Sequence, residues 1–275
     1  MKVNSIGIIG LGTVGNAINH FFSKRNIPVY IYDLHKTPFT NNFKNILKTN
    51  IIFISIPSHF ISKLGCYDIE PFQKILNKLD TNNFKGAILI KSTLSPGTCE
   101  HMSYLFPKLN IIYNPEFLSE NTSIEDFENT KLVILGCTPS LNPKIRDGVG
   151  IFFNKIFPNR IDTEIVDSKE AECVKLYLNS FYAVKVQFFN ELFFITKNLN
   201  ISWENITPLM CQQGWLNPQH TRVPGNDGKY SYGGKCLPKD ACALLSIMKH
   251  HNSYNKILNA AIDENIVIRP ENYSI

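Results

Sequence analysis

The sequence contains no CxxC pair that is matched by a second such pair or by a cluster of histidines, although it has seven cysteines. An odd number of cysteines without that spacing predicts neither a disulfide framework nor a zinc site, so we expect no bound metal. The amino terminus also lacks the basic region, apolar core and small-residue cleavage site of a secretory signal. We therefore expect a reducing, cytoplasmic location.

Long uninterrupted apolar runs are missing as well. The most apolar stretch, Cys173 to Ile195, is broken by Lys175, Asn179, Lys185, Gln187, Asn190 and Glu191. Such groups oppose insertion into a bilayer, so the stretch predicts a buried helix and no membrane partner. The 28 Lys and Arg residues are dispersed against 23 Asp and Glu, which argues against binding to nucleic acid.

Short apolar runs alternate with longer mixed segments through the first half of the chain, a pattern typical of parallel strands joined by helices. The predicted strands are Ser5 to Ile9, Val29 to Tyr32, Ile51 to Ile56, Ala87 to Lys91, Ile111 to Tyr113 and Leu132 to Leu135. This half predicts an α/β domain with a doubly wound sheet.

The sequence pattern changes at Asp167 to Glu170. A start that resembles a capping box is followed there by a segment without Gly or Pro as far as Pro208. We therefore predict two domains, residues 1–166 and a smaller all-helical domain of residues 167–275 with a long central helix. Residues 215–234 are rich in Pro, Gly, Asn and Asp and predict an ordered loop or lid.

A glycine-rich turn follows the first predicted strand and precedes a predicted helix. Gly10, Gly12 and Gly15 form a GxGxxG pattern around Thr13 and Val14. In this context the pattern predicts a Rossmann-type dinucleotide site with the pyrophosphate at the helix start, although a bare turn has the same spacing. Asp33, at the end of the second predicted strand, is suited to bind a ribose and to repel a 2'-phosphate, which favours NAD even with His35 and Lys36 nearby.

A candidate nucleophile and a polar helix pair lie in the second half. Cys236 follows Gly233-Gly234 and precedes Pro238, so a helix start and nearby lysines would favour its thiolate. Lys175 and Asn179 are four residues apart and share a helix face, where they serve either catalysis or structural hydrogen bonds.

Five ordered segments carry a family resemblance. They are the Gly10 to Gly15 turn, Lys91 to Thr93 (KST), Tyr113 to Glu120 (YNPEFLSE), the Lys175/Asn179 pair and Gly233 to Asp240 (GGKCLPKD). Along nearly the whole chain this set resembles the UDP-glucose/GDP-mannose dehydrogenases.

The resemblance implies a four-electron, NAD-dependent oxidation of the primary alcohol of a nucleotide sugar to a carboxylate, most simply UDP-glucose to UDP-glucuronate. Cys236 would form the thiohemiacetal and thioester, Lys175 and Asn179 would stabilise the oxyanion, Asp240 and Thr93 would position a water or base, and Glu120 would promote hydrolysis. The implied cofactor contacts also include Thr93, Glu120 and Lys239. The implied substrate contacts are Glu116, Phe117, Leu118, Lys175, Asn179, Arg222, Tyr232 and Gly233.

The resemblance also implies a homodimer through the central helix, and that helix is rich in phenylalanine on more than one side. Typical relatives continue into a third domain, whereas this chain ends about where their connecting helix would begin. Three alternatives stay open: GDP-mannose as substrate, a two-electron 3-hydroxyacid-type dehydrogenase in which Cys236 has no role, and a non-catalytic NAD-binding module.

Overall fold

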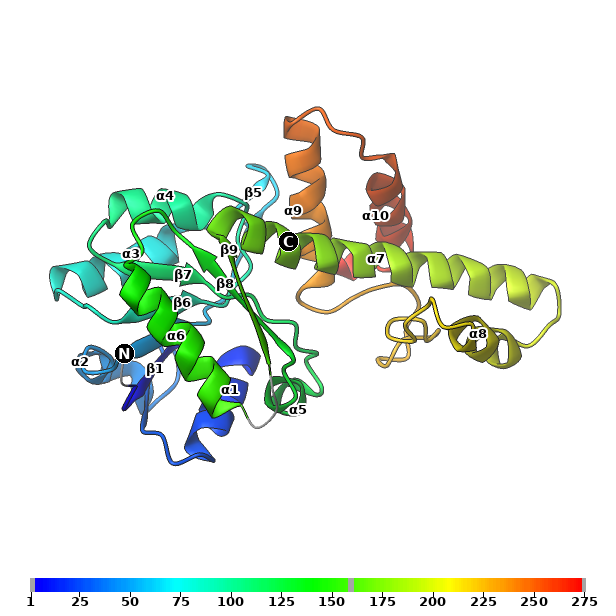
Figure 1. Ribbon diagram of the computed structural model, residues 1–275. Helices are drawn as coiled ribbons and strands as arrows, with labels where there is room; N and C mark the ends of the chain where they lie inside the picture. Colours follow the sequence, from blue (N-terminus) through cyan, green and yellow to red (C-terminus); the bar gives the residue numbers. More distant parts are fainter. Residues whose placement is uncertain (1–2, 158–160, 274–275) are drawn as a thin grey trace. The chain divides into compact units, whose positions relative to one another are not determined.

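The chain divides into two compact units in the computed structural model, which describes residues 3–157 and 161–273 (Figure 1). Unit 1 consists of Met1–His59 and Tyr67–Lys175, and unit 2 consists of Phe60–Cys66 and Leu176–Ile275. The domain boundary between residues 166 and 167 stays a prediction.

A seven-stranded sheet forms the centre of unit 1, with the order β2-β1-β3-β6-β7-β8-β9. The strands are β1 (Ile6–Ile9), β2 (Val29–Tyr32), β3 (Ile51–Ile54), β6 (Ala87–Ile90), β7 (Asn110–Tyr113), β8 (Leu132–Cys137) and β9 (Asp162–Asp167). Neighbours are parallel except β7 and β8. The predicted α/β class and its six strands are confirmed. The sequence did not indicate β9, because this strand is largely exposed and has no apolar run.

Helices cover both faces of this sheet, so its central strands are buried on both sides (Figure 1). Side chains of α1 (Thr13–Ser23), α5 (Ser123–Glu128) and α6 (Pro143–Ile156) pack on one face; α2 (Phe43–Ile46), α3 (Glu70–Thr81) and α4 (Thr98–Leu105) supply the other. A 3₁₀ turn, η1, covers Phe39–Asn41. In β3, Phe53 belongs to the first core and Ile52 to the second, and both are fully buried. Two-sided burial explains why these strands are continuous apolar runs rather than alternating ones.

Unit 2 is built from helices around two small cores. It contains most of α7 (Ser168–Asn198), with α8 (Trp203–Gln212), α9 (Leu237–His250), α10 (Lys256–Ile268) and the 3₁₀ turn η2 (Pro270–Asn272). Two short strands, β4 (Phe60–Ile61) and β5 (Cys66–Tyr67), form a separate sheet. The predicted capping pattern is present at the start of α7, where the Asp167 amide donates to Glu170 Oε2 over 3.0 Å.

The long helix α7 has apolar residues on more than one side, as the sequence indicates. In the single chain, Tyr177, Phe181 and Phe188 are each more than half exposed. Its inner face packs on α9 and α10 through Ala183 and on Trp203 through Phe189. A helix with phenylalanine on two sides buries only one side within its own unit, and the other is left uncovered. Within the described ranges, no helix is both long and apolar enough to cross a membrane.

Candidate active site

Five polar or glycine residues lie in one row along the carboxyl edge of the unit 1 sheet. The strand register places Tyr32, Ile9, Ile54, Ile90 and Tyr113 level with one another. The residues that follow them are Asp33, Gly10, Ser55, Lys91 and Asn114. Backbone hydrogen bonds extend one step into this row, for example from the Lys91 amide to the Ile54 carbonyl over 2.9 Å. Parallel sheets bind ligands at this edge. The same strand register therefore places both the glycine-rich turn and the polar segments that follow β6 and β7.

The glycine-rich turn has the backbone that its sequence predicted. Gly10 has a φ of 92°, and a methyl group there would lie 2.8 Å from the Ser55 carbonyl oxygen. A methyl group on Gly15 would lie only 2.1 Å from the Gly10 carbonyl oxygen, whereas one on Gly12 would meet nothing within 4 Å. Gly15 is therefore needed for helix packing, while the space over Gly12, at the start of α1, is open to a phosphate group.

Asp33 is tied to the same turn. Its carboxylate accepts hydrogen bonds from the Leu11 amide over 2.7 Å and the His35 amide over 2.9 Å. Burial by itself would raise the pKa of Asp33, but hydrogen bonds from Leu11, His35 and Lys36 and the Lys36 charge hold this pKa below its usual value. An adjoining hollow of about 590 Å³ is lined by Gly10, Tyr32 and Asp33, among others. The open Gly12 surface, the ionised carboxylate and this hollow fit a dinucleotide with an unmodified ribose.

A buried group of charged side chains follows β6 and β7 in unit 1. Lys175 Nζ donates to the Glu116 carbonyl oxygen over 2.6 Å and lies 3.1 Å from Glu116 Oε1. Both side chains are nearly buried, at 4% and 11% exposure. Lys91 Nζ donates to Asn114 Oδ1 over 3.0 Å, and Asn114 Nδ2 donates in turn to the Ile134 carbonyl of β8. The structure thus pairs the predicted Lys175 with Glu116.

The other predicted residues of unit 1 lie around this group. Thr93 is buried two residues beyond Lys91, and Phe117 is 39% exposed with its ring 5.6 Å from Lys175 Nζ. The Leu118 amide donates to Glu116 Oε2 over 2.7 Å. Glu120 is exposed in the turn before α5. Their predicted contacts with cofactor or substrate stay predictions.

The remaining catalytic candidates meet at the start of α9 in unit 2. Asn179 Nδ2 donates to Asp240 Oδ2 over 2.6 Å, and Lys239 forms an ion pair with the other carboxylate oxygen. Asp240 is fully buried, and its amide donates to the Cys236 carbonyl one turn earlier. Cys236 is exposed at the amino-terminal cap of α9. A thiol at this position is favoured as a thiolate by the helix dipole.

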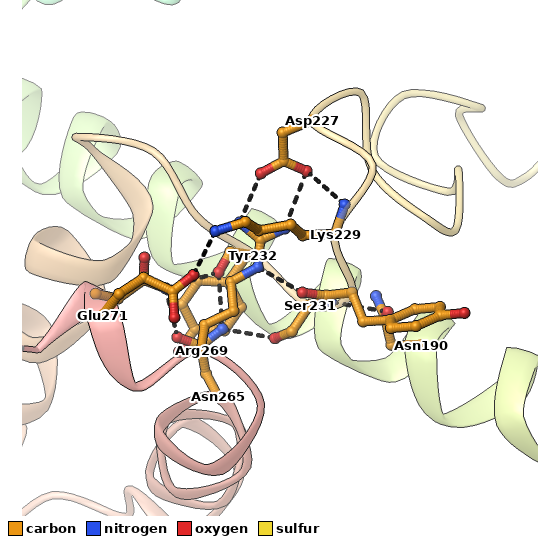
Figure 2. A network of polar contacts seen from close by, with 10 residues as sticks. Asn190, Asp227, Lys229, Ser231, Tyr232, Asn265, Arg269 and Glu271 are labelled. Carbon is orange, nitrogen blue, oxygen red and sulfur yellow. Dashed lines mark hydrogen bonds and ion pairs between the residues drawn. The ribbon is translucent and has the colours of Figure 1, made fainter.

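A polar network holds the loop that leads to Cys236 (Figure 2). Arg269 donates through both terminal nitrogens to Asp227, over 2.6 and 3.0 Å, and through Nε to the Tyr230 carbonyl. Asn265 Nδ2 donates to the Tyr232 carbonyl over 2.7 Å and to Ser231 Oγ over 2.6 Å. The loop is therefore fixed by side chains of α10 and the residue after it, and also by Asn190 of α7, which accepts from the Ser231 amide over 2.8 Å.

Two predicted substrate contacts, Tyr232 and Gly233, lie in this network. Tyr232 is 2% exposed, and its hydroxyl lies 3.2 Å from that of Tyr273. Burial and this neighbour raise the pKa of Tyr232. A methyl group on Gly233 would lie 2.1 Å from Arg269 Nη1. Both residues thus lie against other residues of this network, and their contact with a substrate stays a prediction.

Arg222, the third predicted substrate contact of this loop, lies in a different part of unit 2. Its Nη1 donates to Asn226 Oδ1 over 3.3 Å, and it lines a hollow of about 630 Å³ with Trp203, Glu204 and Cys211, among others. Its predicted role also stays a prediction. Among the described residues, no group of three or more His, Cys, Asp or Glu side chains is arranged to hold a metal ion.

Comparison with known proteins agrees with this geometry. Residues 31–145 match the NAD binding domain of the UDP-glucose/GDP-mannose dehydrogenase family, and residues 169–266 match its central domain. The chain belongs to this family. Unit 1 accordingly contains the NAD-binding domain of a UDP-glucose/GDP-mannose dehydrogenase, which confirms the predicted cofactor and the resemblance.

Curated relatives in this family are longer than the chain. A UDP-glucose 6-dehydrogenase of Campylobacter jejuni is 27% identical over 94% of this chain and 71% of its own length. A UDP-glucose 6-dehydrogenase of Rickettsia bellii is 28% identical over 88% of this chain and 58% of its own length. The match therefore covers between 58% and 71% of the length of these two dehydrogenases.

Solved structures show the same fold. The UDP-glucose dehydrogenase of Pyrobaculum islandicum matches 96% of this chain and 68% of its own, with a TM-score of 0.76 and 19% identity. A 3-hydroxyisobutyrate dehydrogenase of Mycobacterium tuberculosis matches 98% of this chain and 95% of its own, with a TM-score of 0.72 and 14% identity. Fold likeness alone does not separate the two activities, so the separation depends on the site residues.

Sequence reasoning missed one buried acid beside the family motif. Glu172 of α7 is fully buried and accepts hydrogen bonds from the Gly97 amide over 2.5 Å and the Cys99 amide over 2.8 Å. Burial raises its pKa to about 7. It caps α4, and the signal that could have found it is its position one turn before Lys175 on an apolar helix.

Proposed function

We propose that this protein oxidises the primary alcohol of a nucleotide sugar to a carboxylate, with UDP-glucose as the leading substrate, through a thioester on Cys236. The observation that carries the proposal is the start of α9. There an exposed cysteine at a helix cap is followed one turn later by a buried carboxylate that Asn179 and Lys239 hold. A two-electron dehydrogenase forms no thioester, so its reaction does not require this cysteine.

The reaction consumes one alcohol, two NAD⁺ and one water, and yields one carboxylate, two NADH and three protons. NAD, when bound, accepts the hydride in each of the two oxidations. The Cys236 thiolate adds to the aldehyde carbon between these steps, and after the second oxidation water displaces the thiolate from the thioester. The turn at Gly12 and the carboxylate of Asp33 would hold the cofactor, and the hollow beside Asp33 is suited to its adenosine.

The buried charges of unit 1 fit the oxyanion part of this scheme. Lys175 carries an ammonium group whose acceptors in the structure are both on Glu116. A cation fixed in this way stabilises a developing alkoxide with little reorganisation. Glu116 is the carboxylate nearest to that ammonium, so it joins Glu120 as a candidate for moving a proton during hydrolysis. Thr93 would help to position the water.

A second candidate is the two-electron oxidation of a 3-hydroxyacid, supported by the fold likeness to 3-hydroxyisobutyrate dehydrogenase over almost the whole of both chains. A non-catalytic NAD-binding module is the third. The number of NADH molecules formed per substrate separates them: two for the thioester route, one for the hydroxyacid route and none for a module.

Our first experiment measures NADH formed from NAD with UDP-glucose, GDP-mannose and a 3-hydroxyacid in turn. We expect two NADH per UDP-glucose, and no turnover after Cys236→Ala. Cys66→Ala is the matched control, because Cys66 is also exposed but lies outside the motif, and it should leave the rate unchanged. A single NADH per substrate, or full activity of Cys236→Ala, would refute the thioester route.

We also propose that the protein is a homodimer through α7. Exposed apolar residues follow that helix at intervals of three, four and seven, as Val174, Tyr177, Phe181, Phe188 and Ile195. A regular apolar stripe of this kind is suited to a second copy of the same helix. Sedimentation should show a dimer, and Phe181→Glu with Phe188→Glu should convert it to a monomer. A wild-type protein that sediments as a monomer contradicts this.

A further inference from the structure

Lys91 is a buried lysine to which the proposed reaction assigns no task. It is the first residue after β6 and is only 6% exposed. Nζ donates to Asn114 Oδ1 over 3.0 Å and approaches the Pro115 carbonyl oxygen at 3.4 Å, and both acceptors are neutral. The ring of Phe127 lies 5.9 Å away. An ammonium group held by two amide oxygens is costly to bury, which calls for a reason.

Both acceptors of Lys91 belong to the turn that carries Glu116. Asn114 and Pro115 directly precede Glu116, and Lys175 bonds both the carbonyl and the carboxylate of Glu116. The amide of Asn114 is fixed on its other side by the Ile134 carbonyl, over 2.8 Å. Lys91 therefore closes a chain of contacts that runs through the turn to Lys175, all within unit 1.

Electrostatics connect the same residues. Burial lowers the pKa of Lys91 to about 7, the Glu116 charge opposes this shift, and the Lys175 charge adds to it. These two are the charged groups that act on Lys91, one from the turn after β7 and one from α7. Lys91 is therefore ionised at acid pH and neutral at alkaline pH.

We infer that Lys91 is a positioning residue, which holds the Asn114–Glu116 turn against Lys175 and whose own proton strengthens the positive field at Lys175. With Lys91 protonated, a second cation stands behind Lys175 and helps to stabilise a negative oxygen there. With Lys91 neutral, that contribution disappears while the turn stays in place. At an effective dielectric constant near ~20, a unit charge about 12 Å from the developing oxyanion changes a rate by on the order of tenfold.

The inference rests on the proposed oxidation, so its test has one part that needs no turnover. Protein labelled with [ε-¹³C]lysine is titrated by NMR without substrate, and the Lys91 signal is assigned by its loss in Lys91→Met. We expect that signal to titrate near pH 7. A Lys91 signal that titrates above pH 9.5 would overturn the inference whatever the enzyme oxidises.

The kinetic part compares kcat against pH for the wild type, Lys91→Arg and Lys91→Met. Arginine stays charged at every pH in the range, so the ratio of Lys91→Arg to wild type should rise about tenfold from pH 6 to pH 8.5. Lys91→Met lacks both the charge and the hydrogen bond to Asn114, so its deficit should be about tenfold larger at pH 6 than at pH 8.5, where only the loss of the hydrogen bond remains. A purely structural role would lower kcat by the same factor at every pH, and that outcome contradicts the inference.

Lys85→Met is the matched control, because Lys85 is exposed and precedes the same strand at its opposite end. It should copy the wild-type profile. If the arginine side chain does not fit, Lys91→Met alone decides through its pH-dependent deficit. If no nucleotide sugar is oxidised while the Lys91 signal titrates near pH 7, the proposed function fails and the placement of Lys91 stands.

Discussion

The two units position their candidate residues by different means. In unit 1, Gly10, Lys91 and Asn114 take their places from the register of neighbouring strands, which is set by backbone hydrogen bonds. In unit 2, the loop before Cys236 has no strand to follow and is held by the side chains of Asn265 and Arg269. In unit 1 the arrangement depends on backbone hydrogen bonds and on the space around the backbone. In unit 2 it depends on a few buried side-chain amide and guanidinium groups.

Both tryptophans of the chain, Trp203 and Trp215, belong to unit 2, and Trp203 is buried. Tryptophan fluorescence therefore reports the unfolding of unit 2, while amide hydrogen exchange in the β1 to β7 strands reports unit 1. The contrast between the units can be tested with these two probes, from the largest expected effect to the smallest.

The largest effect is expected for Gly15→Ala in unit 1. The new methyl group would lie 2.1 Å from a backbone carbonyl oxygen, which cannot move without disturbing the register, so we expect a loss of ~3 kcal/mol in the free energy of unfolding. Exchange protection of β1 should fall while Trp203 fluorescence changes less. Gly12→Ala, which meets nothing within 4 Å, should leave stability nearly unchanged and weaken NAD binding. Equal destabilisation by both changes would contradict this account.

Asn265→Leu should have the largest effect in unit 2. It removes the buried donor to the Tyr232 carbonyl and the partly buried acceptor for Asn272 and Tyr273. Leaving such groups unsatisfied costs roughly 2 to 3 kcal/mol, seen as a lower urea midpoint by tryptophan fluorescence. Asn259→Leu on the same helix loses only an exposed contact with Asp263 and should change the midpoint little. A similar midpoint for both variants would argue against the network.

Glu172 gives unit 1 a pH dependence. Its pKa is raised to about 7 by burial, so the folded protein binds this proton more tightly than the unfolded chain does. Its contribution to stability is therefore largest below pH 4.5 and is lost as the pH rises to about 7, by on the order of 3 kcal/mol. Glu172→Gln should remove this slope in urea unfolding measured from pH 5 to pH 8. An unchanged slope in the variant would assign the effect to other groups.

The smallest effect is expected at the rim of the unit 2 network. Lys229 and Glu271 form an ion pair over 2.7 Å, but both side chains are more than half exposed. Water screens such a pair, so Lys229→Ala should leave the urea midpoint of tryptophan fluorescence within measurement error. A shift as large as that of Asn265→Leu would mean that the network is held from its rim rather than from its centre.

The same contrast explains what the sequence could predict. The strands of unit 1 were predictable because two-sided burial demands apolar runs, and the GxGxxG turn because Gly10 and Gly15 answer steric needs that no other residue meets. Sequence also pointed to Asn179 and Asp240 without indicating that the two side chains bond one another. Such a contact depends on the packing of α7 against α9, which short-range patterns do not encode.

Other features were hidden for physical reasons of the same kind. Arg269 and Asp227 are 42 residues apart, and nothing local marks either as a partner. Glu172 lies on a largely apolar helix, and nothing local indicates that the amides of Gly97 and Cys99 at the start of α4 donate to its carboxylate. The phenylalanine content of α7 indicated apolar residues on more than one side, but it does not say whether the same chain or a second copy covers the side that is exposed here.

The alignment of the strand ends limits where residues can be inserted or deleted in this protein. The strands that end level with one another are β2, β1, β3, β6 and β7. A single-residue insertion within any of these strands turns the following side chains to the opposite face of the sheet, so Lys91 or Asn114 would leave the row. Insertions in the segments that enter the strands from the other edge, such as residues 24–28 or 82–86, leave the row intact. We therefore expect the protein to tolerate insertions and deletions in the segments before the strands, and to lose the aligned row of residues when they fall within the strands.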